Sequence, residues 1–209
     1  MDKTDRLRSA LKQLICSADK GADADKAVSS LLEGSYSAWE VFEMAAEDIS
    51  VQTGLNPAAA QAIDLIDELS RYVAVERMGQ SPKLDTVQAL GAYFNALFRG
   101  RHVEYSYLAC LDERRKLIRC VFLGKGTPDR MAIHLRDIMQ AAMRTGARYA
   151  ALAHNHPGGT LVPSTQDVDF TRKAQNTLSL IDVVLCEHVI SARGEYLGII
   201  EAGYLQNNQ

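Results

Sequence analysis

The fourteen residues from His154 to Asp167 constrain this chain more than any other part of its sequence. They read HNHPGGTLVPSTQD and include two histidines, a carboxylate, hydroxyl groups, two prolines and two glycines. The segment 151–153 before them is apolar, and a helix-like pattern follows them. We therefore predict a strand end, a loop and a helix start, with metal-binding side chains on both sides of the loop.

The spacing of the two histidines indicates a shared site. Residues two apart in a strand face the same side of the sheet, so the imidazoles of His154 and His156 can reach one point. Asp167 would join them from the first turn of the next helix. Two imidazoles and one carboxylate leave a fourth tetrahedral position open, which is typical of catalytic zinc. The sequence therefore predicts one Zn²⁺ per chain, with room for a water molecule that it can activate.

The same residues also have a purely structural interpretation. Ser164 and Asp167 fit the Ser-x-x-Asp form of a capping box, in which the serine caps the helix and the aspartate favours its dipole. On this interpretation neither residue has a chemical role. A His-x-His pair in a loop does not by itself decide between the two interpretations.

The composition and charge of the chain indicate which broad classes of protein it can belong to. A chain of 209 residues with 47% apolar and 23% charged residues is typical of soluble globular proteins. Its net charge of −3 argues against a dominant nucleic-acid-binding surface, which usually has a basic excess. No apolar run reaches the roughly 18 residues that span a bilayer, and the N-terminus lacks a signal-peptide pattern, so we predict a cytoplasmic location. The cysteines form no CxxC pair and are expected to be reduced thiols: Cys16, Cys110, Cys120 and Cys186.

Residues 1–80 are predicted to form a helical domain, because apolar residues recur there at helical spacing. Trp39, Phe42 and Met44 are expected to contribute to a small core. Pro57 suits the first turn of a long helix that runs to about Glu76. The apolar stripe of that helix is predicted to be Ile63, Ile66, Leu69 and Val73.

A short helix ending at Gly54, followed by the helix from Pro57, has the shape of a helix-hairpin-helix unit. Backbone N–H groups in such a hairpin can hold a phosphate, so Gly54, Leu55 and Asn56 are candidates for DNA contact. Asn56 stands where a second glycine is common, and it tolerates positive φ. The lysine that often follows is missing, which leaves a structural or protein-contacting role open.

Residues 84–206 are predicted to form a second domain after a linker at 78–83. Helical and strand-like segments alternate there, which favours the α/β class in its α+β form, with helices on a mixed sheet. The predicted helices are 85–98, 131–145 and 167–179. The predicted strands are 103–111, 117–123, 148–153, 181–190 and 195–200.

The order His-x-His-Pro, six residues, Ser, two residues, Asp resembles the JAMM (MPN+) metalloprotease motif. The longer string AHNHPGG…PS..D…T resembles the RadC branch of that superfamily, and LCEHVI at 185–190 is similar to the LLDHIIV-type strand of that branch. The helix-hairpin-helix unit also matches the RadC layout, so the resemblance covers nearly the full chain. It implies a cytidine-deaminase-like JAB/MPN domain after the helical domain.

The resemblance also implies roles for individual residues. His154, His156 and Asp167 correspond to the zinc ligands, and Ser164 corresponds to a serine that helps to hold the oxyanion. Glu104, at the start of the first strand, corresponds to the general base. The alternative for Glu104 is a solvated carboxylate at a strand start.

Three departures from the family pattern matter. Val121 and Phe122 stand where the second strand often has acidic residues, so they offer no other base. His134-Leu-Arg-Asp replaces a His-Pro-Arg-Glu run and loses its proline. Glu187-His188 replaces Asp-His in the late strand, where we expect His188 to be a hydrogen-bonded structural histidine.

These observations lead to three hypotheses. The first is a zinc-dependent hydrolase that acts on a peptide, isopeptide or related amide bond of a peptide or protein substrate, with the substrate class implied by the resemblance. The second is a DNA-repair-associated or nucleic-acid-binding accessory protein with a structural metal and a weak DNA contact. The third is a protein-interaction module with a vestigial site. The oligomeric state is left open by the sequence.

Overall fold

The computed structural model describes residues 3–33, 41, 44–101, 103–126 and 133–205. The chain divides into two compact units, residues 1–73 and 74–209, each of which has its own core. Of the residues expected in a small aromatic core, Trp39 and Phe42 lie outside the described part, whereas Met44 packs against the core of the first unit. Among the described residues, none of the helices has the length and hydropathy of a membrane-spanning segment.

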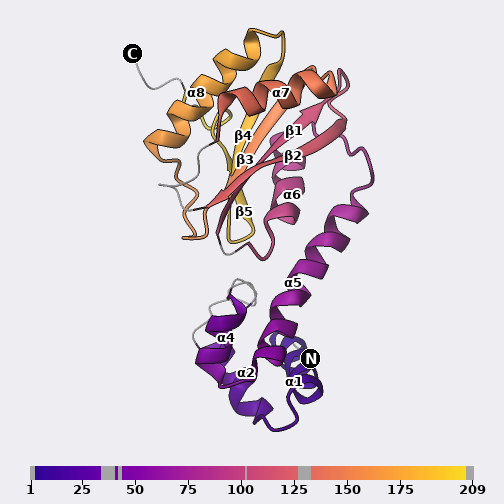
Figure 1. The fold of residues 1–209 in the computed structure, drawn as a ribbon, viewed down its shortest axis with the longest axis vertical. Helices are drawn as coiled ribbons and strands as arrows, with labels where there is room; N and C mark the ends of the chain where they lie inside the picture. The colour runs from indigo at the N-terminus through magenta and orange to yellow at the C-terminus, as the bar shows by residue number, and fades with distance from the viewer. Residues whose placement is uncertain (1–2, 34–40, 42–43, 102, 127–132, 206–209) are drawn as a thin grey trace. The chain divides into compact units, whose positions relative to one another are not determined.

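The first unit is helical, as the sequence predicts (Figure 1). Its helices are α1 (Lys3–Ala18), α2 (Ala24–Glu33), α4 (Ala46–Thr53) and α5 (Pro57–Arg77). Its core draws on all of them, and its largest fully buried side chains are Leu11, Ile15, Leu31, Ile49 and Ile63.

The predicted apolar stripe of α5 is only partly correct. Ile63 is fully buried, but Ile66, Leu69 and Val73 are 38%, 65% and 46% exposed. The core of the first unit takes Ala59, Ala60 and Ile63 from α5, so burial is confined to the first turns of the helix. Helical periodicity indicates which residues share a face, but it does not show how far along the helix that face is covered.

The second unit contains a five-stranded sheet of order β2-β1-β3-β4-β5. β3 and β4 are parallel, and the other neighbours are antiparallel, so the sheet is mixed and the predicted fold class is confirmed. The strands are β1 (Glu104–Leu111), β2 (Leu117–Gly126), β3 (Tyr149–Asn155), β4 (Val184–Ala192) and β5 (Glu195–Gly198). The helices of this unit are α6 (Val87–Phe98), α7 (Leu135–Thr145) and α8 (Thr165–Ser179).

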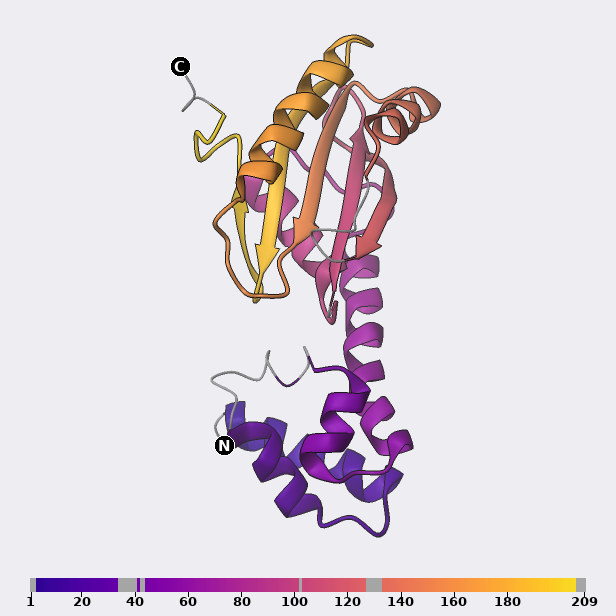
Figure 2. The same cartoon turned by 60° about the vertical axis from the view of Figure 1, so that its left-hand side comes forward.

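Helices cover both faces of the sheet, with α7 and α8 on one face and α6 on the other (Figures 1 and 2). The strand residues alternate between the two layers, as a pleated strand requires. In β1, Leu108 and Cys110 join the core beneath α7 and α8, whereas Ala109 and Leu111 join the core beneath α6. The same alternation continues in β3, where Leu152 faces α7 and α8.

A β-bulge interrupts this alternation in β4. Ala150 of β3 pairs with Leu185, but the next residue, Ala151, pairs with Glu187, so Cys186 is the extra residue. The bulge places Glu187 opposite Ala151, on the α6 face, and His188 opposite Leu152, on the α7 and α8 face.

The Glu187 carboxylate is buried and ties β4 to the segment after β5. It accepts hydrogen bonds from the backbone N–H groups of His188, Ile200 and Glu201, at 2.8, 2.7 and 3.0 Å. Three donors satisfy much of the hydrogen-bonding capacity of a carboxylate that is only 2% exposed. These hydrogen bonds give Glu187 a structural role in the fold and explain why its carboxylate is buried.

Candidate metal centre

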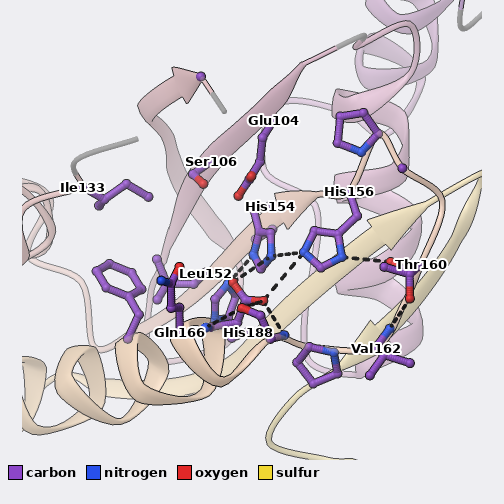
Figure 3. Close-up of a pocket in the computed structure, with 18 of the residues that line it drawn as sticks. Glu104, Ser106, Ile133, Leu152, His154, His156, Thr160, Val162, Gln166 and His188 are labelled. Carbon is purple, nitrogen blue, oxygen red and sulfur yellow. Dashed lines mark hydrogen bonds and ion pairs between the residues drawn. The ribbon is translucent and has the colours of Figure 1, made fainter. Parts of the chain in front are cut away.

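The candidate site forms where one strand ends and one helix begins. β3 carries His154 to the edge of the α7 and α8 face, where it pairs with Ser106 of β1. His156 follows directly after the strand, and its N–H donates to Ser191 O at 2.8 Å. Asp167 lies in the first turn of α8. The fold therefore brings together the three ligands that the sequence predicts. Figure 3 shows the two histidines side by side in the pocket.

The nitrogen and oxygen atoms of these three side chains converge. The Nε2 atoms of His154 and His156 are 2.9 Å apart. Asp167 Oδ1 lies 3.3 Å from His154 Nε2, and Asp167 Oδ2 lies 3.7 Å from His156 Nε2. One ligand atom from each residue falls within 4.8 Å of the others, so the group could bind a metal ion.

The hydrogen bonds around His156 show that the cluster is rich in acceptors. His156 Nδ1 lies 2.9 Å from the backbone oxygen of Thr160, and a carbonyl can only accept, so Nδ1 carries the hydrogen. The Nε2 atom of the neutral ring then presents a lone pair to Asp167, whose ionised oxygens also only accept. A bound cation satisfies such an arrangement, and two nitrogens with one carboxylate oxygen suit zinc and similar divalent metals.

The electrostatics of the site favour the forms that bind metal. Burial lowers the pKa of His154 to about 4, with Asp167 opposing and His156 reinforcing the shift. Burial alone would raise the pKa of Asp167, but its contacts with His156, His154 and Ser164 outweigh burial and hold that pKa far below its usual range. At neutral pH His154 is therefore neutral and Asp167 is ionised. Metal ligation requires both of these states.

The pKa of His156 shifts in the opposite direction to that of His154. Burial lowers its pKa, but the contact with Asp167 and the hydrogen bond to Thr160 O outweigh burial, so the net pKa of His156 is raised. Without a metal, a proton on His156 Nε2 can occupy the space between the acceptors. A metal has to displace that proton.

Ser164 forms the capping box that the structural interpretation predicts. Its Oγ accepts from Asp167 N at 3.1 Å, and Asp167 Oδ2 accepts from the N–H and the hydroxyl of Ser164, each at 2.7 Å. Asp167 Oδ1 still faces His154. Capping and metal ligation are therefore compatible, because they use different oxygens of one carboxylate.

Glu104 lies in the same pocket and is buried. It is only 7% exposed, which contradicts its alternative interpretation as a solvated carboxylate. Its carboxylate points toward His154 and His156 (Figure 3). Burial raises its pKa, with His156 opposing the shift and Asp167 reinforcing it. A carboxyl group with a raised pKa beside a metal site is suited to exchanging protons near neutral pH.

The pocket that contains these residues has a volume of about 1040 Å³. Its polar end is formed by the candidate ligands with Glu104 and Ser164, and its apolar wall includes Ile133, Leu152 and Phe170. A cavity of this volume can hold a segment of a peptide or a ligand of similar size.

Two residues behind the ligands complete the polar cluster. His188 is 4% exposed, and its Nε2 lies 2.8 Å from His154 Nδ1, so it is the hydrogen-bonded histidine that the sequence predicts. Thr171 Oγ1 lies 2.6 Å from His188 Nδ1. The sequence assigns no role to Thr171, although it stands one helical turn after Asp167, and that spacing places both residues on one face of α8.

The candidate DNA contact belongs to the first unit, where its N–H groups already have partners. Gly54, with φ of 73°, donates to Ser50 O, and Leu55 donates to Thr53 Oγ1. Asn56 N donates to Asp19 Oδ2 at 2.9 Å, and Asn56 Oδ1 accepts from Ala59 N. Asn56 therefore caps α5, and it does not use the positive φ that the sequence allows.

Comparisons with known proteins match this chain to one family. A family model described as a RadC-like JAB domain matches residues 84–204, which include every residue of the candidate metal centre. A UPF0758 protein of Azotobacter vinelandii is 33% identical over 158 residues, covering 75% of this chain and 70% of the relative. A UPF0758 protein of Bordetella bronchiseptica is 35% identical over 158 residues, covering 76% and 70%.

A UPF0758 protein of Burkholderia cenocepacia is 30% identical over 165 residues, which are 79% of this chain. The match spans 64% of the length of that relative. The name shared by these relatives states no activity. The matched domain agrees with the fold described above. The chain therefore belongs to the RadC-like JAB domain family.

Proposed function

We propose that this chain is a zinc-dependent hydrolase that cleaves a peptide, isopeptide or related amide bond. The observation that carries the proposal is the convergence of His154, His156 and Asp167 on one point, in a pocket that also holds the buried carboxylate of Glu104. The JAB superfamily includes metal-dependent hydrolases, which supports the same reaction class. The chemical class of the substrate follows from the family resemblance.

The residues of the pocket have complementary tasks in this reaction. A zinc ion held there would polarise the substrate carbonyl and lower the pKa of a water molecule at its open position. Glu104 accepts a proton from the attacking water and then donates it to the departing amine. Its raised pKa suits both steps, because the carboxyl group can hold the proton between them.

Ser164 is proposed to stabilise the oxyanion that develops on the substrate carbonyl. Its hydroxyl lines the pocket, but it donates to Asp167 Oδ2 at 2.7 Å. It would have to rotate toward the substrate in order to donate to an oxyanion. The N–H of Ser164 would continue to hold Asp167 in place during that rotation.

The first test is the metal content of protein purified without chelators. Elemental analysis should find about one zinc per chain, as expected for a site with three protein ligands and an open position. His154→Ala and Asp167→Ala should each lose the metal. His134→Ala is the matched control, because His134 is exposed at the start of α7, and it should keep full occupancy. A wild-type protein that binds no transition metal would contradict the proposal.

The second test separates metal binding from chemistry. Glu104→Gln should keep its zinc but cleave substrate at least about 100-fold more slowly, because a general base contributes roughly 10²–10⁴-fold. A library of proteome-derived peptides, analysed by mass spectrometry, supplies the substrate. If Glu104→Gln cleaves at the wild-type rate, Glu104 is not the base. If zinc-loaded wild-type protein cleaves no peptide, the bond type that we propose for the substrate is wrong.

A further inference from the structure

A row of buried polar side chains adjoins the candidate metal ligands, and two of its members, His154 and His188, also line the pocket. Thr171, His188 and His154 are 0%, 4% and 3% exposed. Thr171 Oγ1 lies 2.6 Å from His188 Nδ1, and His188 Nε2 lies 2.8 Å from His154 Nδ1. The row joins α8, β4 and β3, and it ends at a predicted ligand.

The proton positions along this row follow from one carbonyl. Thr171 Oγ1 also lies 2.6 Å from the backbone oxygen of Asp167, and that oxygen can only accept. The hydroxyl proton therefore points to Asp167 O. The lone pairs of the same hydroxyl face His188 Nδ1, which must carry its ring hydrogen in order to donate to them.

The position of the hydrogen on His188 determines which nitrogen of His154 carries a hydrogen. His188 is only 4% exposed, and its two ring nitrogens face a hydroxyl and a second imidazole, neither of which is an anion that would hold a second proton on the buried ring. A neutral ring with hydrogen on Nδ1 has a bare Nε2, which accepts from His154 Nδ1–H. The Nε2 atom of His154 is thereby left with its lone pair facing His156 and Asp167.

We propose that Thr171 and His188 are positioning residues that fix His154 in the Nδ1–H tautomer and thereby set the affinity of the site for its metal. This inference rests on the proposed metal site. His156 obtains the same tautomer directly from a backbone carbonyl, that of Thr160. His154 obtains it through two side chains, so its tautomer depends on a hydroxyl that lies two hydrogen bonds away.

The row also couples two of the ligands. Thr171 bonds to the backbone of Asp167, and His188 bonds to the side chain of His154. One hydroxyl thus helps to align a ligand on α8 with a ligand on β3. Partners that hold the second nitrogen of a ligating histidine commonly contribute about 10–100-fold to metal affinity.

The first test reads the tautomers in the metal-free full chain. With nitrogen-15-labelled histidine, long-range proton–nitrogen NMR above neutral pH distinguishes Nδ1–H from Nε2–H rings, and single histidine substitutions assign the signals. Wild type should show Nδ1–H for both His154 and His188. An Nε2–H pattern for His154 in wild type would overturn the proposal, and this reading requires no variant of Thr171 to fold.

The second test measures affinity for zinc alone by competition with a fluorescent chelator. Thr171→Val keeps the shape of the side chain but removes its hydroxyl, so His188 and His154 should lose their single tautomer and zinc affinity should fall about 10–100-fold. Thr171→Ser should restore both readouts. Thr177→Val, farther along the same helix, is the matched control and should leave both unchanged.

The outcomes separate this inference from the proposed function. If wild type binds zinc and Thr171→Val has the wild-type tautomers and affinity, the positioning role is wrong and the metal site stands. If wild type shows the predicted tautomers but binds no metal, the proposed function fails and only the hydrogen-bond assignment survives. Loss of affinity that Thr171→Ser does not restore would also count against the role of the hydroxyl.

Discussion

At the scale of single residues, a metal ion and one proton compete for the same atom, Nε2 of His156. His154 is neutral at neutral pH because burial lowers its pKa to about 4, and the pKa of Asp167 lies far below its usual range. His156 is the exception, because Asp167 and Thr160 O outweigh burial and raise its pKa above the usual 6.5. One titrating group therefore dominates the pH dependence of metal binding.

We predict that zinc affinity rises with pH by about tenfold per pH unit below the pKa of His156 and then levels off, because binding releases one proton. The stability of the metal-free protein changes with pH in the opposite direction. Because the pKa of His156 is higher in the folded protein than in the unfolded chain, protonation of His156 stabilises the metal-free fold. This stabilisation is complete below the unfolded pKa and is lost as the pH rises through the folded pKa. Chelator competition between about pH 6 and about pH 8 measures the slope. A slope near zero or near two protons would contradict the assignment of a single titrating histidine.

The sequence predicts that the three candidate ligands come together, because their geometry is local. His154 lies near the end of β3, His156 follows directly after the strand, and Ser164 fixes Asp167 in the first turn of the next helix. Glu104 could be assigned only through the family resemblance. Its position depends on the antiparallel register that sets Ser106 opposite His154, and no local pattern specifies a register between distant strands.

At the scale of elements, the start of α8 serves the fold and the site together. The capping box ends the loop, starts the helix and aims Asp167 at the histidines. Loss of the cap should therefore weaken the helix even where no metal is bound.

We predict that Ser164→Ala lowers the free energy of unfolding of the metal-free protein by about 1 kcal/mol, because replacing a serine N-cap by alanine costs about 0.5–2 kcal/mol. Ser164→Thr keeps a capping hydroxyl and should lose less. Urea unfolding followed by circular dichroism measures both. Thr165→Ala, at an exposed neighbouring hydroxyl outside the cap, is the control. Equal losses for Ser164→Ala and Thr165→Ala would show that the cap contributes nothing.

Element boundaries were harder to predict where turns bond back onto helices. The apolar run 181–190 predicts a strand, but β4 begins only at Val184 and continues to Ala192. Asp182 has φ of 58°, and the N–H groups of Ile181 and Val183 donate to Leu178 O at the end of α8. The first residues of the run are therefore a helix-terminating turn, in which Ile181 and Val183 are apolar because they pack into the core beside the helix end.

At the scale of the whole molecule, charge and hydrogen bonding disfavour the nucleic-acid hypothesis. The net charge is −3, and the hairpin at 54–56 has an aspartate, Asp19, where a phosphate would have to sit. A phosphate would need to displace that carboxylate from Asn56 N. Like charges at this point oppose each other.

We predict that the full chain shows no specific affinity for duplex DNA. Fluorescence anisotropy at about 50 mM and about 200 mM salt tests this, because contacts to phosphates make affinity fall steeply with salt. Asp19→Asn removes the competing charge and is the variant most able to gain binding. Tight, strongly salt-dependent binding by wild type would revive the hypothesis of a DNA-repair accessory protein.

The bulge at Cys186 has a consequence for how the gene of such a protein can change. Because Cys186 is the extra residue, deleting its codon would remove the bulge and leave Glu187 opposite Ala151 and His188 opposite Leu152, as they are now. His188 would therefore stay on the α7 and α8 face, within reach of His154. A lineage can therefore lose one residue at this point of β4 without moving the residues behind the metal ligands to the other face of the sheet.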